Sequence, residues 1–69
     1  MFTIFIRTLS ADGEVENTSI SGAVFQERKD AVASLDKMVK QHPNAGYDAK
    51  QDLWWTRENG PITHYTIGA

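Results

Sequence analysis

The sequence predicts a small α+β domain of ββαββ order, in which a four-stranded, mainly antiparallel sheet carries one amphipathic helix on one face. Three observations lead to this prediction. Apolar and polar residues alternate near both ends of the sequence, as they do in half-buried strands. Between these segments the apolar residues follow helical spacing. The 69 residues are enough for a single domain, residues 1–69, and leave little room for an internal active-site cavity.

The first expected strand lies in the segment MFTIFIRTL, where alternate positions over residues 2–6 form a strongly apolar face. We expect this strand in the interior of the sheet. Residues 10–13 are typical of a turn and predict a three-residue loop in which Gly13 adopts the left-handed conformation. Such a loop would place Ile4 opposite Ile20.

The second expected strand covers residues 14 to about 24 and is polar and rich in β-branched side chains. Glu14 and Glu16 stand near its start. Charge of this kind suits a strand at the edge of a sheet, because it discourages pairing with other chains.

A helix is expected over about residues 27–41, followed by Pro43 and Gly46, which end it. Its apolar side is formed by Ala31, Val32, Leu35, Met38 and Val39. After the helix, the residues around Tyr47 are compatible with a short fifth strand and a turn, or with a loop.

The last two strands form a hairpin around Asn59-Gly60, and its register decides which of two adjacent tryptophans enters the core. A two-residue loop would place Trp54 opposite Tyr65. A three-residue loop over residues 58–60 would place Trp54 opposite His64 instead. We expect the three-residue loop, because one face of the hairpin then matches the apolar side of the helix. The residues of that face are Leu53, Trp55, Tyr65 and Ile67.

The expected register leaves an apolar patch on the sheet face that the helix does not cover, and such patches usually mark contact surfaces. We therefore expect the partner-binding residues to be Phe5, Trp54, Arg57, Ile62 and His64. A purely structural interpretation stays open, in which Trp54 lies across neighbouring strands and pairs with His64.

No residue pattern predicts catalysis, a metal site or a cofactor. The carboxylate pairs Glu14 with Glu16 and Asp48 with Asp52 lack the number and spacing of ligands that calcium or zinc needs. The glycines are dispersed and form no phosphate-binding loop. We expect a protein that is not an enzyme and that takes no cofactor, metal or small-molecule substrate.

The composition limits the kinds of partner and the cellular location that we expect. Seven lysines and arginines against nine acidic residues give a net charge of −2, which argues against nonspecific nucleic-acid binding. The absence of cysteine fits a reducing cytoplasm. The N-terminal segment lacks the features of a signal peptide, and no stretch is long and apolar enough to span a membrane. We expect a cytoplasmic protein.

The leading hypothesis is a protein-binding module that covers a surface of its own copy or of a larger partner. In topology and size alone, the arrangement resembles many small bacterial proteins of unknown role and small phage-encoded inhibitors of host defence, such as some anti-CRISPR proteins. This resemblance implies a phage- or mobile-element-type inhibitor of a host complex.

Two alternatives stay open. An open sheet can stack nucleobases on aromatic residues, so that Phe5, Trp54 and His64, bordered by Arg7 and Arg57, would bind single-stranded nucleic acid. The other alternative is a homodimer with a structural role.

Overall fold

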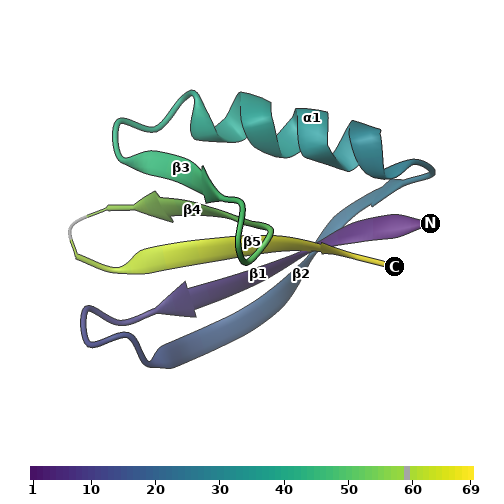
Figure 1. Ribbon diagram of the computed structural model, residues 1–69. Helices are drawn as coiled ribbons and strands as arrows, with labels where there is room; N and C mark the ends of the chain where they lie inside the picture. Colours follow the sequence, from purple (N-terminus) through teal and green to yellow (C-terminus); the bar gives the residue numbers. More distant parts are fainter. Residues whose placement is uncertain (59) are drawn as a thin grey trace.

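The computed structural model describes residues 1–58 and 60–69, and it consists of one helix packed on one face of a five-stranded antiparallel sheet (Figure 1). The elements are β1 (Phe2–Leu9), β2 (Val15–Phe25), α1 (Arg28–Val39), β3 (Ala45–Asp48), β4 (Leu53–Arg57) and β5 (Ile62–Gly68). Their order across the sheet is β2-β1-β5-β4-β3. The predicted α+β class is confirmed, and the fifth strand near Tyr47 is present as β3.

The turn between β1 and β2 has the predicted form. Gly13 has a φ of 88°, and the N–H of Ser10 donates to the carbonyl of Glu14 at 2.8 Å. Ser10 and Glu14 therefore close a three-residue loop in which Gly13 is left-handed. β1 has a neighbour on each side and β2 lies at the edge, which confirms both placements.

A β-bulge after this turn changes the register that the turn alone predicts. Glu16 is the extra residue, and residues 17–20 of β2 are displaced by one position, up to a second irregularity opposite Ile4. Ile20 consequently faces Phe5, and the predicted pair of Ile20 with Ile4 is wrong. Because Ile4 points toward α1, the bulge sends Ile20 to the opposite face of the sheet.

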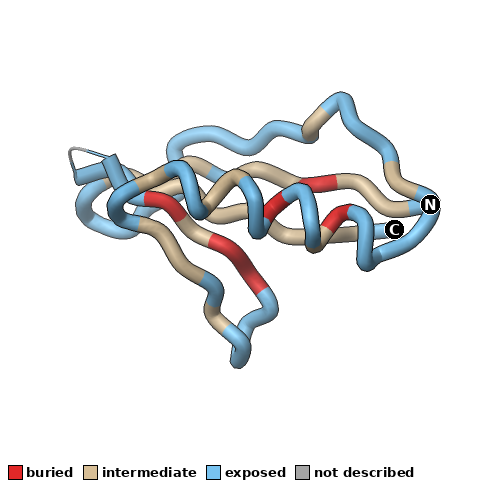
Figure 2. The backbone as a smooth tube through the Cα atoms, turned by 90° about the horizontal axis from the view of Figure 1, so that it is seen from above, coloured by how far each residue is buried: buried red, intermediate tan, exposed pale blue. Residues whose placement is uncertain are grey.

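The helix is shorter than predicted, since it starts after Glu27 and ends before Lys40. Its predicted apolar side is confirmed: Ala31 and Leu35 are fully buried, and the other three residues of that side pack against the core. Figure 2 shows the buried parts of α1 close to buried parts of the sheet, with the outer side of the helix exposed. No helix of the described residues is long and apolar enough to cross a membrane.

The β4–β5 hairpin has the register that the sequence analysis rejected. Trp54 faces Tyr65 and Trp55 faces His64, so the predicted pair of Trp54 with His64 is wrong. The N–H of Glu58 donates to the carbonyl of Pro61 at 3.2 Å, as in a hairpin with a two-residue loop. Asn59, which belongs to both loops considered, lies outside the described residues.

The core explains why this register is adopted. Trp54 is 2% exposed and packs in one cluster with Ile4 and Leu35. Its indole Nε1–H donates to Asp36 Oδ1 at 2.8 Å, and the ring of Tyr47 lies 4.5 Å from its own, centroid to centroid. A buried indole needs an acceptor for its N–H, and in this register Asp36 of α1 supplies one to Trp54. The number of apolar side chains on each face of the hairpin does not reveal this hydrogen bond, which comes from a distant element.

This arrangement predicts that the two tryptophans contribute very differently to stability. Trp54→Ala should lower the free energy of unfolding by about 3–5 kcal/mol, because it empties the core and leaves Asp36 without its donor. A domain of this length has a total stability on the order of 5 kcal/mol, so the variant should be largely unfolded. Urea denaturation followed by far-ultraviolet circular dichroism measures the effect.

Trp55→Ala is the matched control for this measurement, since it deletes the same side chain one position along the strand. Its loss of stability should be clearly smaller. If Trp55→Ala proves as costly as Trp54→Ala, the register described above is incorrect.

Candidate functional site

The face of the sheet that points away from α1, called here the open face, collects side chains from every strand. Strand pairing and the alternation of side chains assign its members. They include Thr18 and Ile20 of β2; Phe5, Arg7 and Leu9 of β1; Ile62, His64 and Thr66 of β5; Leu53, Trp55 and Arg57 of β4; and Gly46 and Asp48 of β3.

Four of the five predicted site residues lie on the open face, namely Phe5, Arg57, Ile62 and His64. Trp54 does not, because it is buried under α1, and its predicted place on this face is wrong. β5 keeps the faces that were predicted for it, whereas the shift of one residue turns β4 over. Trp55 therefore takes the position expected for Trp54.

Strand pairing aligns a basic and aromatic row across the middle of the open face. Arg7 of β1 faces His64 of β5, and His64 faces Trp55 of β4. Neighbouring strands lie about 4.8 Å apart, so these three side chains are direct neighbours. Arg57 follows Trp55 by two residues and points to the same side.

The arginines of the open face are not neutralised by ion pairs within the described chain. Within the described chain, the ion pairs join Arg28 to Asp52, Lys29 to Glu27 and His42 to Glu58, and none of them involves the arginines of the open face. Asp48 lies at the margin of the face, and its Oδ1 already accepts the N–H groups of the following turn.

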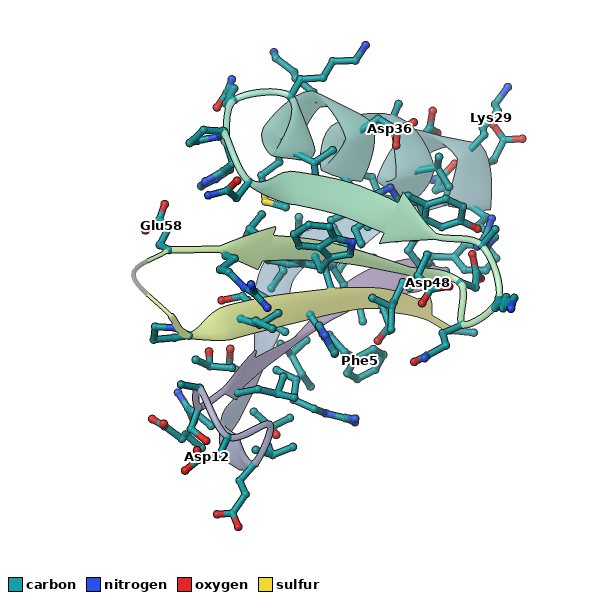
Figure 3. The ribbon with its side chains drawn as sticks, turned by 60° about the vertical axis from the view of Figure 1, so that its left-hand side comes forward. Phe5, Asp12, Lys29, Asp36, Asp48 and Glu58 are labelled. Atoms are coloured by element: carbon teal, nitrogen blue, oxygen red, sulfur yellow. The ribbon has the colours of Figure 1, made fainter. Side chains whose placement is uncertain are left out.

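Two aromatic rings of the open face rest on glycine backbone. A Cβ placed on Gly68 would lie 2.3 Å from the ring of Phe5, and one on Gly46 would lie 3.1 Å from the ring of Trp55. Each ring thus covers a neighbouring strand where that strand has no side chain. Figure 3 shows Phe5 beside the C-terminal end of β5. Both rings are held in place and stay partly exposed.

A hollow of about 410 Å³ lies on this face between the row and Phe5. Its apolar surface comes from Phe5 and from Leu53, which is 8% exposed, and its polar groups come from Arg7, His64 and Thr66. A recess of this composition suits a ligand group with an apolar body and an anionic or hydrogen-bond-accepting end.

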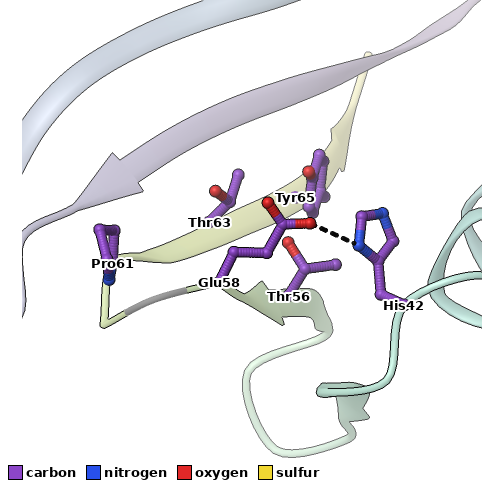
Figure 4. Close-up of a pocket in the computed structure, with 6 residues that line it drawn as sticks. All are labelled: His42, Thr56, Glu58, Pro61, Thr63 and Tyr65. Carbon is purple, nitrogen blue, oxygen red and sulfur yellow. Dashed lines mark hydrogen bonds and ion pairs between the residues drawn. The ribbon is translucent and has the colours of Figure 1, made fainter.

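A second hollow, also of about 410 Å³, lies on the other side of the sheet beyond the end of α1 (Figure 4). At its mouth, His42 Nδ1 and Glu58 Oε1 lie 3.2 Å apart, and the hydroxyl side chains of Thr56, Thr63 and Tyr65 line its wall. An imidazole oriented by a carboxylate can act as a base. Among the hydrogen bonds of the described residues, however, no hydroxyl donates to this imidazole.

The described residues contain no group of three or more side chains that could hold a metal ion. Outside the two hollows, a cluster of charged and polar side chains connects α1 to the β3–β4 turn. Asp52, whose φ is 53°, accepts hydrogen bonds from the hydroxyl of Tyr47 at 2.7 Å and from the guanidinium of Arg28 at 2.5 Å.

This cluster shifts two titrations in opposite directions. The hydrogen bond from Tyr47, followed by that from Arg28, lowers the pKa of Asp52 below its ordinary value. The same hydrogen bond to Asp52 raises the pKa of Tyr47. Both groups are at the surface, so we assign the cluster a role in holding the turn.

Comparison with models of known protein families, with curated protein sequences and with solved structures finds no match to this chain. The site must therefore be interpreted from its own geometry.

The lowered pKa of Asp52 predicts that the cluster is lost in acid. A carboxyl with a depressed pKa in the folded state stabilises the fold above its unfolded value, 3.8, and this contribution disappears as the pH falls through the folded pKa. The free energy of unfolding should therefore fall more steeply below pH 3.8 in the wild type than in Asp52→Asn.

Asparagine also tolerates a positive φ, so the variant keeps the backbone of the turn and removes the titrating charge together with its ion pair to Arg28. The measurement is urea denaturation at a series of acidic pH values. Parallel curves for the two proteins would show that Asp52 does not carry this dependence.

Proposed function

We propose that the protein is a non-enzymatic binding module that covers an acidic patch of a protein partner with its open face. The observation that carries the proposal is the row of Arg7, His64 and Trp55, placed side by side by strand pairing. Tryptophan and arginine are the residues that most often dominate the binding energy of protein interfaces. The adjacent hollow supplies the recess into which a partner side chain fits.

The charge of this face is opposite to that of the whole chain, which is −2. Arg7 and Arg57 have no carboxylate partner among the described residues, whereas Arg28, on α1, has Asp52. Apart from Asp48 at the margin of the face, most acidic residues lie elsewhere, at the β1–β2 turn, in α1 and in the loops. An acidic partner would be attracted to the arginines of the open face, which favours one orientation.

Occlusion is the mode of action that we propose, since covering a surface needs neither a cavity nor catalytic groups. In this form the protein is an inhibitor of a larger host complex, of the phage- or mobile-element type to which anti-CRISPR proteins belong. The missing cysteines are our ground for including a cytoplasmic location in the proposal.

The proposal predicts that partner binding depends on the row and on its charge. Arg7→Glu and Trp55→Ala should each weaken binding by about tenfold or more, because they remove a central interface contact. Binding by the wild type should also weaken as salt is raised. The measurement is quantitative capture from a lysate on the immobilised protein, followed by titration of each captured protein.

Lys37→Glu is the control, because it makes the same change of charge on an exposed position of α1. Its binding should equal that of the wild type. A partner that binds Arg7→Glu, Trp55→Ala and Lys37→Glu with equal affinity does not use the open face.

The same row favours a second candidate function, the binding of single-stranded nucleic acid. Trp55 and Phe5 are partly exposed aromatic rings beside two arginines without carboxylate partners. Bases stack on such rings, and arginines contact the phosphates.

This candidate predicts that an oligothymidylate quenches tryptophan fluorescence at low salt, with an affinity that falls as salt is raised. The quenching should disappear in Trp55→Phe, because the remaining Trp54 is buried. Unchanged fluorescence of the wild type at low salt would eliminate nucleic acid as the ligand.

A further inference from the structure

β2 leaves one complete strand edge without a partner in the described chain. It is the outermost strand on its side and pairs with β1 alone. It is also the longest strand, with 11 residues, of which all but Ser21 and Phe25 are exposed. The outward N–H and C=O groups of such a strand are a template for another strand.

The middle of β2 lacks the features that usually protect an edge. Residues 17–24 contain neither charge nor proline, and residues 17–20 pair with β1 in a regular run between two irregularities. Ile20 and Val24 are 62% and 61% exposed, which is unusual for large apolar side chains. The protection is confined to the start of the strand, at Glu14 and Glu16.

The opposite edge of the sheet is different. β3 has only four residues, and the side chain of Tyr47 in its middle is engaged by Trp54 and by Asp52. Short edge strands are themselves a protection against pairing. Of the two edges of the sheet, β2 is therefore the one to which a strand of another chain can add.

We propose that β2 pairs antiparallel with β2 of a second copy of this chain, so that two sheets join into one continuous sheet. Self-complementarity selects this occupant. In a two-fold pairing centred near Ser19, the uncharged middle of each strand meets itself, and Glu16 lies opposite Gly22 of the other copy. The acidic ends then lie far apart, and no like charges face each other across the new ladder.

The pairing also accounts for the exposure of Ile20. The two-fold axis stands perpendicular to the joined sheet, so both open faces lie on one side and both α1 helices on the other. Ile20 of each copy is then covered at the seam. The inference is independent of the proposed function, although the dimer would present the Arg7, His64 and Trp55 row twice.

Sedimentation equilibrium over a wide range of protein concentration tests the inference. The wild type should reach twice the monomer mass of 7.7 kDa. Ser19→Lys, which places a charge at the centre of the edge, should stay monomeric with an unchanged circular dichroism spectrum. Ser34→Lys makes the same substitution on the exposed side of α1 and should dimerise like the wild type.

Two proline variants keep the test decisive if Ser19→Lys is destabilised. Adjacent residues of a strand direct their N–H groups to opposite sides, so one of Thr18→Pro and Ser19→Pro removes an outward N–H and spares the ladder with β1. That variant should be folded and monomeric. The other should be less stable.

Hydrogen exchange locates the interface. The outward-pointing amides of β2 should be protected in the wild-type dimer and exchange rapidly in Ser19→Lys, whereas the amides bonded to β1 should be protected in both. A wild type that is monomeric at every concentration overturns the inference, as does a dimer that survives Ser19→Lys or leaves β2 unprotected. If the dimer dissociates only in Trp55→Ala, the interface lies on the open face and the inference is overturned. If Arg7→Glu loses partner capture but keeps the dimer, the result bears on the proposed function and leaves the inference about β2 intact.

Discussion

The hydrogen bond from the Trp54 indole to Asp36, made beneath α1, is the interaction on which the rest of this small protein depends. It decides which side of β4 faces the helix. Because side chains alternate along a strand, that single choice sends Trp55 and Arg57 to the other face, beside His64. The core and the candidate interaction face are therefore determined together.

The sequence predicts local features of the fold well. The helix, its apolar side, the left-handed Gly13 and the edge position of β2 all follow from patterns within short segments, and the structure confirms them. The register of the last hairpin is different. Both faces of LWWTR are mixed, so burial alone does not choose between them, and the deciding contact comes from Asp36 in a distant element. The Asn59-Gly60 pair carried the correct signal.

The same distinction applies to the candidate site. The structure confirms the predicted faces of Phe5, Ile62 and His64. The first strand has one clearly apolar face, and the last strand was expected to turn Tyr65 and Ile67 toward the helix. Trp55 was missed because its face depended on the hairpin register. The row itself also needed the order of the strands, since Arg7 and His64 lie far apart in sequence and meet only through the β1–β5 pairing. Nothing in a single segment predicts that pairing.

The β1–β5 pairing has a further consequence for how the protein folds. It joins the strands at the two ends of the sequence, with Thr3 opposite Gly68, in the middle of the sheet. The β1–β2 hairpin and the β3–β4–β5 meander are each local, whereas their union closes a loop of nearly the whole chain. Loops of that length close slowly, and contacts between distant residues delay folding. The open face is complete only where this non-local pairing is made, because Arg7 and Arg57 lie on the two different pieces of the chain that it joins.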